Sequence, residues 1–397
     1  MSSFSENKGT GTLGNEGLIS RRGVLSLGVL ACVLGSAERS ALAKPEESDE
    51  EALPKAARPV VRNFRRATGT PGLVIALYDK GNAQVWGVGR ARSDRAGAPD
   101  QNTVFGIGSV TKVFTSTLFA HRVVAQPQRF KLDDPVAQHL PWLPKTGLGD
   151  IEKVTLKMLA THTAGFPEHG PSGETLFLDQ QPSAELVDWW KSWKLPKQAA
   201  KKIGTVYEYS SIGTVTLGYA VSGTEYNQHL QRAINQPLGM TSTAAGTFLP
   251  KDAQLAQGHI ERKGATVALD TLNVDLNSTG ADMLRFLQAE LGVLAAGTPL
   301  GRAIELTQAV QFPKAGKKFD MGLGWKITHK SPVVFSKNGV TSKGGASSWI
   351  GAVPSTQQGL VILTNKVATA KKYDVGIDAF AADLLAALTG VQMGKGG

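Results

Sequence analysis

Cysteine is almost absent from this sequence, since Cys32 is the only one among 397 residues. A single thiol cannot close an internal disulfide. Cys32 also lies upstream of a small-residue cleavage site at Ala41-Leu42-Ala43, and cleavage there would leave a mature chain with no cysteine. Cysteine catalysis and thiolate metal sites are therefore excluded for the mature chain.

Motifs for metals and phosphates are missing as well. The seven histidines are spread singly without an HExxH pattern, and the spacing of His162 and His169 fits no single helix face. The stretch GIGSVTK lacks the Gly-Lys-Ser/Thr ending of a phosphate-binding loop. We therefore expect no metal and no cofactor.

Basic residues are numerous but form no tract. The formal net charge is +10, yet the lysines and arginines are scattered, without a long basic run or an aromatic-basic alternation. This pattern argues against a nucleic-acid partner. A diffuse positive charge instead suits attraction to anionic substrates or to an anionic envelope.

The first 43 residues have the pattern of an export signal. Arg21-Arg22 resemble a Tat signal and precede an apolar stretch that is shorter than the ~20 residues a membrane span needs. We expect residues 1–43 to be a cleaved signal peptide, and the mature protein to be periplasmic without a stable membrane span. The alternatives are a membrane anchor and a lipoprotein signal ending at Cys32, although the preceding residues match a lipoprotein box poorly.

Strand patterns occur at both ends of the mature chain. After a helical stretch at 56–66, two β-rich runs meet at Lys80-Gly81-Asn82, which predicts a hairpin. Residues 105–309 are mainly helical in period, whereas apolar β-type runs return over 322–366. A closing helix is predicted at 373–388.

This arrangement predicts an α/β fold with an antiparallel sheet built from both termini, flanked by helices, and an inserted mostly helical domain. We place a discontinuous α/β domain at 44–104 and 318–397, and the helical domain at 105–317. A cleft between the two parts is where a ligand site is expected.

A Ser-x-x-Lys pattern lies at the start of a predicted helix, within FGIGSVTKVFTS. Ser109 and Lys112 are one helical turn apart, so the lysine can reach the hydroxyl and take part in its activation. The alternative is that Ser109 only caps the helix. The pattern alone does not decide, because Ser5-Glu6-Asn7-Lys8 in the leader matches it equally well. An apolar stripe at helical spacing supports the helix itself: Val110, Val113, Phe114 and Leu118.

Two further stretches favour the nucleophile. TVYEYSSIGTVTLGYA places Tyr207 before an apolar helix, and FSKNGVTSKGG places Lys337-Asn338-Gly339 on a strand. With these, the chain resembles the serine β-lactamase and penicillin-binding-protein superfamily, and most of all class C β-lactamases. The motifs Ser-x-x-Lys, Tyr-x-Asn and Lys-Thr-Gly occur in the family's order, with matching text in LATHTAGFP, INQPLGMTST, MGLGWK and ILTNK.

The resemblance implies an acyl-enzyme on Ser109, with Lys112 and Tyr207 sharing the proton transfers and Lys337 adding positive charge for a substrate carboxylate. It places the oxyanion hole at the backbone N–H groups of Ser109 and Val340. The substrate-binding residues that we then expect are Tyr209, Asn338, Gly339 and His169.

Four departures from the family pattern concern the substrate. Tyr209 stands where the second motif has asparagine, and Asn338 stands where the third has threonine. Ser342-Lys343 resembles a short insertion, and Asn365-Lys366 is not followed by the asparagine-rich stretch of class C enzymes.

We therefore predict an exported, monomeric serine hydrolase that opens β-lactam rings. Three alternatives use the same site: a D,D-carboxypeptidase or endopeptidase acting on peptidoglycan peptides, an esterase, and a non-enzymatic penicillin-binding sensor that stays acylated. A carboxylate-binding Lys337 is of little use to an esterase.

Overall fold

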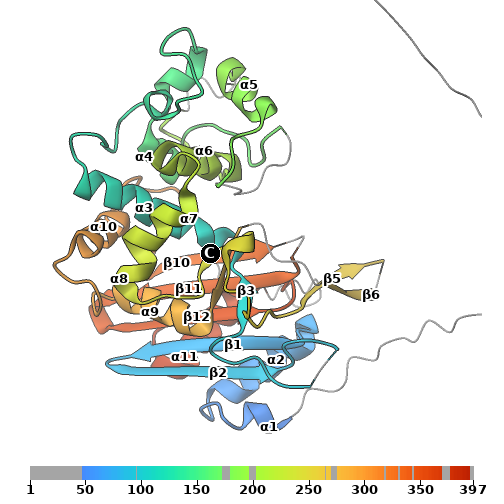
Figure 1. The fold of residues 1–397 in the computed structure, drawn as a ribbon. Helices are drawn as coiled ribbons and strands as arrows, with labels where there is room; N and C mark the ends of the chain where they lie inside the picture. Colours follow the sequence, from blue (N-terminus) through green and yellow to red (C-terminus); the bar gives the residue numbers. More distant parts are fainter. Residues whose placement is uncertain are drawn as a thin grey trace, which may run out of the picture. The chain divides into compact units, whose positions relative to one another are not determined.

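A seven-stranded antiparallel sheet combines strands from both ends of the chain (Figure 1). The computed structural model describes residues 47–94, 96–171, 179–195, 203–263, 265–269, 275–316, 319–329, 331–341, 344–368 and 376–393. The strands lie in the order β2 (Asn82–Gly89), β1 (Gly72–Asp79), β12 (Gln358–Thr364), β11 (Ala346–Val353), β10 (Phe335–Thr341), β9 (Lys326–Thr328) and β8 (Phe319–Met321).

The predicted hairpin at 80–82 is confirmed. Lys80 and Gly81 both have positive φ, 49° and 98°, which suits the two-residue turns that match the twist of antiparallel strands. Strand β1 then pairs on its other side with β12, and Leu73 lies opposite Thr364. The two ends of the chain are thereby joined in the middle of one sheet.

Both faces of the sheet are covered, and this explains why β1 reads as a continuous apolar run. Leu73, Ile75 and Leu77 face a smaller core under α2 (Ala57–Thr68) and α11 (Ile377–Thr389). Within that core the rings of Phe64 and Phe380 stack with centroids 3.9 Å apart. The two helices predicted from the sequence are thus confirmed as one layer of the fold. A short helix, α1 (Glu47–Glu50), precedes them.

Alternate residues of β1, Val74 and Ala76 among them, face a larger core on the opposite side of the sheet. Helix α9 (Gly280–Glu290) packs directly on β1 and β12, and α3 (Thr111–Ala125) packs on α10 (Pro299–Gln308). The remaining helices are α4 (Leu156–Ala160), α5 (Ala184–Ser192), α6 (Ser211–Ser222), α7 (Tyr226–Leu230) and α8 (Gln236–Leu238). Figure 1 shows α4, α5 and α6 farther from the sheet, with α5 the most distant, whereas α8 packs on α9.

Two small sheets complete the fold. One consists of β3 (Val104–Gly106), β7 (Leu276–Thr279) and β4 (Ala244–Ala245), and the other is the hairpin β5 (Gly258–Arg262) and β6 (Ala265–Leu269). The single-turn segments are η1 (Gly108–Val110), η2 (Val136–His139), η3 (Gly149–Lys153), η4 (Gln231–Asn235), η5 (Gly246–Phe248) and η6 (Pro354–Thr356).

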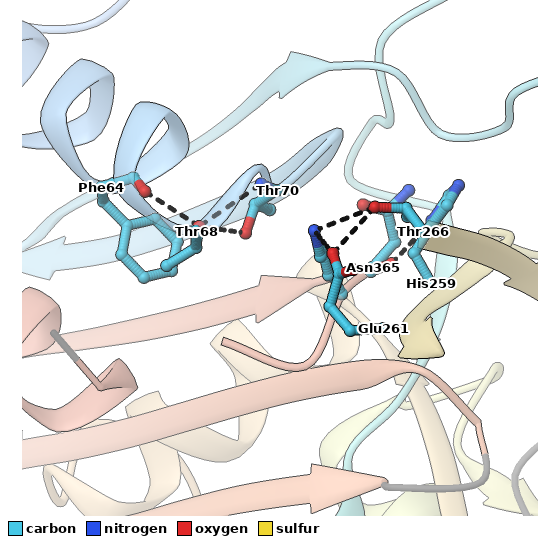
Figure 2. A network of polar contacts seen from close by, with 8 residues as sticks. Phe64, Thr68, Thr70, His259, Glu261, Thr266 and Asn365 are labelled. Carbon is cyan, nitrogen blue, oxygen red and sulfur yellow. Dashed lines mark hydrogen bonds and ion pairs between the residues drawn. The ribbon is translucent and has the colours of Figure 1, made fainter. Parts of the chain in front are cut away.

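The end of β12 attaches the β5–β6 hairpin to the main sheet (Figure 2). The Asn365 carbonyl lies 2.9 Å from His259 Nδ1, and the Asn365 side chain accepts a hydrogen bond from the Gly72 N–H at 2.8 Å. Lys366 forms a 2.6 Å ion pair with Glu261. Asn365 and Lys366 therefore connect the end of β12 to the β5–β6 hairpin and to the start of β1.

The predicted fold class, an antiparallel sheet from both termini with a mainly helical insertion, is confirmed. The domain limits within it stay a prediction. The predicted signal peptide and Cys32 lie outside the described residues, as do Ser342 and Lys343. Among the described helices, none combines the length and the apolar character needed to cross a membrane.

Candidate active site

Ser109 lies in the single turn η1, which leads directly into α3. Its side chain does not cap the helix, because no side-chain capping bond is present at the start of η1 or of α3. Instead, Ser109 Oγ lies 2.6 Å from Tyr209 Oη and accepts a hydrogen bond from Lys112 Nζ at 3.2 Å. The serine hydroxyl is therefore held by two groups that can exchange protons with it.

The first ten residues of helix α3 are buried on all sides, which holds this part of the helix in place. The predicted stripe of Val110, Val113, Phe114 and Leu118 is at most 1% exposed, and the opposite side of the helix is buried as well. Lys112 belongs to that helix and is only 5% exposed. A buried ammonium needs a polar partner, and the Ser109–Tyr209 pair supplies it.

Tyr209 lies between two lysines from different parts of the fold. Lys112 Nζ is 5.2 Å from the centre of the tyrosine ring, and Lys337 Nζ on β10 is 4.8 Å from it. Burial raises the pKa of Tyr209, but the two ammonium groups and the hydrogen bonds from Ser109 and Lys112 outweigh it and lower the pKa to about 8. A phenol in this setting can act as a base near neutral pH.

Lys337 is almost fully buried, with 3% exposure. Burial lowers the pKa of Lys337 to about 8, opposed by Tyr209 and reinforced by Lys112 and Lys326. Tyr209 and Lys337 therefore titrate in the same range and influence one another, so their proton equilibria belong to the pair.

Beside Ser109 the structure places Tyr209 and not Tyr207, so the proton-transfer role predicted for Tyr207 stays a prediction. Tyr207, the predicted proton carrier, packs its ring edge against His162 and Phe319, at centroid distances of 5.8 Å and 5.6 Å. Burial raises the pKa of Tyr207 to about 12. Tyr209 occupies the place beside Ser109 that the sequence analysis gave to Tyr207.

The position of Tyr209 allows a second alignment of the Tyr-x-Asn motif. Counted from Tyr209, the Tyr-x-Asn pattern becomes Tyr209-Ser210-Ser211, with serine in the third position. Ser210 caps helix α6 by accepting a hydrogen bond from the Gly213 N–H at 2.9 Å. No local pattern in the sequence distinguishes Tyr209 from Tyr207, because Ser210 can cap the helix whichever tyrosine meets Ser109.

The third motif presses its backbone against the turn that carries Ser109. A Cβ atom at Gly339 would lie 2.1 Å from the Ile107 carbonyl oxygen, and one at Gly108 would lie 2.7 Å from that of Val340. Ser348 of β11, which lies opposite Gly339 of β10, donates a hydrogen bond to the Ile107 carbonyl at 2.6 Å. The backbones of η1 and β10 are thus in direct contact next to the serine hydroxyl.

Two predicted substrate-binding residues have other contacts. The Asn338 side chain donates a hydrogen bond to the Asp378 carboxylate at 3.0 Å, which connects β10 to the start of α11. His169 is largely exposed, with its Nε2 atom 3.9 Å from Glu168. In the described part of the chain, no group of three or more His, Cys, Asp or Glu side chains could hold a metal ion.

His162 is a neighbour of the site that the sequence analysis considered only as a metal ligand. Its ring centre lies 4.8 Å from that of Tyr209, and the side chain is 2% exposed. Burial and the nearby Lys337 and Lys112 ammonium groups hold the pKa of His162 well below its usual value. The imidazole is therefore neutral.

A serine hydroxyl held by a lysine and a tyrosine is an arrangement that can activate a serine nucleophile. The beta-lactamase family model matches residues 57–383, and the chain belongs to that family. The family and the enzyme class predicted from the sequence, a hydrolase of the β-lactamase type, are thereby confirmed.

Several known proteins resemble the chain over most of its length. A β-lactamase of Escherichia coli (strain K12) is 28% identical over 336 residues, which cover 75% of this chain and 84% of the relative. A β-lactamase of Pseudomonas fluorescens is 26% identical and covers 74% and 88%. The D-alanyl-D-alanine-carboxypeptidase/endopeptidase AmpH of E. coli K12 is 25% identical and covers 75% and 80%.

Solved structures agree on the fold. A class C β-lactamase superposes with a TM-score of 0.71 at 23% identity, over 87% of this chain and 98% of that one. A class C β-lactamase from Rhodobacter sphaeroides gives 0.68 at 26% identity, over 84% and 99%. An octameric penicillin-binding protein homologue from Pyrococcus abyssi gives 0.69 at 23% identity, over 85% and 77%. The monomeric state predicted for this chain stays a prediction.

The two tyrosines can be separated by a matched pair of substitutions. We expect Tyr209→Phe to lower kcat/KM by roughly 10²–10⁴-fold, because it removes the proton acceptor beside Ser109. Tyr207→Phe should stay within a few-fold of the parent, because it retains the ring contacts. Steady-state hydrolysis of an acyl substrate measures both, with thermal unfolding as the control for folding. The reverse order of effects would return the base role to Tyr207.

Proposed function

We propose that this protein is a class C-like β-lactamase that opens β-lactam rings through a covalent acyl-enzyme on Ser109. The observation that carries the proposal is the placement of Ser109 Oγ within hydrogen-bond reach of both Tyr209 Oη and Lys112 Nζ. Lys337 lies against the same tyrosine ring. The cluster supplies a nucleophile, a base of lowered pKa and the cations that lower it.

In the acylation step, the Tyr209 phenolate accepts the Ser109 hydroxyl proton while Oγ attacks the lactam carbonyl carbon. The carbonyl oxygen becomes an oxyanion. When the carbon–nitrogen bond breaks, Tyr209 returns the proton to the departing nitrogen, and the ring-opened product stays attached as an ester. Lys112 donates a hydrogen bond to Ser109 Oγ and so stabilises the negative charge that develops on this oxygen as its proton leaves.

The oxyanion is assigned to the backbone N–H groups of Ser109 and Val340. The tight contact between η1 and β10 supports this assignment, because it brings the backbone of both segments beside the nucleophile. Loss of one such donor typically costs ~10²–10³ in rate. Lys337 and the half-buried Lys326 add the positive charge that attracts the carboxylate of a β-lactam.

Deacylation uses Tyr209 as base again, now with water as the attacking group and Ser109 Oγ as the leaving group. Tyr209 accepts a proton from a water molecule, the resulting hydroxide attacks the ester carbonyl, and the proton passes to Ser109 Oγ as the ester bond breaks. The enzyme is then restored. If water does not reach the ester, the protein remains acylated and acts as a penicillin-binding sensor.

A second candidate function is a D,D-carboxypeptidase or endopeptidase acting on peptidoglycan peptides. The relative named D-alanyl-D-alanine-carboxypeptidase/endopeptidase, of which this chain covers 80%, favours it over the esterase. The chemistry at Ser109 is the same, since a peptide bond replaces the lactam amide. The two candidates differ in the substrate that the cleft accepts.

Two probes separate these functions. With a chromogenic cephalosporin, a β-lactamase turns over many molecules, and a fluorescent penicillin labels it only briefly. A D,D-peptidase should release D-alanine from a D-Ala-D-Ala peptide and keep the penicillin label, whereas a sensor keeps the label without releasing D-alanine. Ser109→Ala should abolish both label and turnover. Labelling of Ser109→Ala equal to that of the parent would refute the acyl-enzyme.

The pH dependence follows from the coupled pair. Tyr209 must be ionised to act as base, so kcat/KM should fall as the pH drops below about 8, the pKa of Tyr209. Lys337 must be charged, so activity should also fall as the pH rises past about 8, the pKa of Lys337. We expect a bell-shaped profile with its maximum near that value.

Removal of the Lys337 ammonium group tests whether this charge causes the low pKa of Tyr209. Lys337→Met should raise the pKa of Tyr209 and move the acidic limb to higher pH, because the phenolate loses a stabilising charge. The exposed Lys145→Met serves as the matched control and should leave the profile in place. An acidic limb that is unchanged in Lys337→Met would contradict this origin of the low pKa.

Export to the periplasm is the remaining part of the proposal, and it rests on Arg21-Arg22 and the Ala41-Leu42-Ala43 site. Expression of the full chain in a bacterium with a working Tat system should give a mature N-terminus at Lys44. Replacement of both arginines by lysine should leave the precursor uncleaved. A lipid-modified N-terminus at Cys32 would establish the lipoprotein alternative instead.

A further inference from the structure

His162 contacts the peptide segment around Tyr209 on both sides of the tyrosine. The backbone carbonyl of His162 accepts a hydrogen bond from the Glu208 N–H at 2.7 Å. Its imidazole Nδ1 accepts one from the Ser210 N–H at 3.2 Å. A single residue thus binds both neighbours of Tyr209.

The geometry of an extended chain makes this arrangement effective. Residues i and i+2 of an extended segment direct their N–H groups to the same side, and the residue between them projects its side chain elsewhere. With Glu208 and Ser210 both bonded to His162, the backbone at Tyr209 has little freedom to rotate. The direction of the phenol is then set by the position of His162.

The backbone of His162 is in an unusual conformation that fits this role. Its φ is +59°, in the left-handed region that residues other than glycine adopt uncommonly, with histidine, asparagine and aspartate the most frequent of them. Among the described residues, its Nε2 atom is buried with no hydrogen-bond partner. A positive φ and an unpartnered buried Nε2 atom both cost stability, whereas the carbonyl and the Nδ1 atom of His162 each hold the segment around Tyr209.

The neutral state of the imidazole is required. Nδ1 can accept the Ser210 N–H only when it carries no proton, which leaves the proton on Nε2. The charged groups that face the imidazole are Lys112 on α3, Lys337 on β10 and Lys326 on β9, and all three disfavour the imidazolium. The lysines that act on Tyr209 therefore also keep the acceptor available.

We propose that His162 is the positioning residue of the catalytic tyrosine: it fixes the backbone on both sides of Tyr209 and so directs the phenol oxygen onto Ser109. This role rests on the proposed function of Tyr209 as the base. His162 itself donates no proton to the reaction and contacts no substrate atom in this assignment.

The test compares two substitutions of His162, one without a hydrogen-bond acceptor and one with an acceptor near the place of Nδ1. His162→Leu retains apolar volume but has no acceptor. His162→Asn carries an oxygen at the δ position and tolerates a positive φ. We expect His162→Leu to lower kcat roughly ten- to hundredfold with little change in KM, because the tyrosine is misaligned while the substrate cleft is intact. His162→Asn should restore most of kcat.

A second readout does not depend on any substrate. Ultraviolet difference titration of tyrosinate, with the matching Tyr209→Phe protein subtracted, reports the pKa of Tyr209 in each variant. In His162→Leu this pKa should rise from about 8 toward the ordinary tyrosine value, because the ring leaves its place between the lysines. In His162→Asn it should stay low.

The outcomes are distinct. An unchanged Tyr209 titration in His162→Leu, or equal loss of kcat in the leucine and asparagine variants, would overturn the positioning role. A parent protein that hydrolyses no acyl substrate would refute the proposed function, while the titration would still decide the role of His162. If His162→Leu does not fold, His162→Gln replaces it, because its amide lies one bond too far out to meet the Ser210 N–H.

Discussion

The site depends on two buried lysines that share one phenol. Lys112 and Lys337 are each at most 5% exposed, and an ammonium that leaves water needs a partner of opposite or polar character. Tyr209 is the partner of both, with its ring 5.2 Å and 4.8 Å from the two nitrogens. Because the lysines come from α3 and β10, the phenol can be reached by both only when the helical part and the sheet are in place.

The sheet contributes more than a support for Lys337. Strand β10 lies so close to the turn that carries Ser109 that a side chain at Gly339 would displace the backbone of Ile107, and one at Gly108 would displace that of Val340. The Ser348 hydroxyl fastens the same contact by donating to Ile107. The nucleophile and the predicted oxyanion donors are therefore positioned by backbone packing, which varies less with side-chain motion than a contact between long side chains does.

The sequence predicts well those features that depend on local periodicity. The hairpin at 80–82, the C-terminal strands and the Ser-x-x-Lys turn each follow from spacing within a few residues. Helix α3 is an example, since one apolar stripe was enough to place Ser109 and Lys112 on neighbouring positions. The fold class also follows, because strands at both chain ends have to meet in one sheet.

Local periodicity does not predict which of Tyr207 and Tyr209 lies beside Ser109. The two residues are separated by one position in an extended segment, and a pattern cannot say which of them meets a serine about one hundred positions earlier in the chain. The decision lies in tertiary contacts: the hydrogen bonds that the Glu208 and Ser210 N–H groups donate to His162, and the one that Ser210 Oγ donates to the Pro167 carbonyl. Asn338 is similar, because its partner Asp378 is distant in sequence.

Tyr207 nevertheless contributes to the site through packing. Its ring joins His162 on one side to Phe319 of the edge strand β8 on the other, and Lys326 lies over the Phe319 ring at 5.3 Å. The segment that carries Tyr209 is thus fixed both to the helical part and to the edge of the sheet. A base that must meet Ser109 within hydrogen-bond distance gains from such fixation, because the energy of alignment is then supplied on folding and not during the reaction.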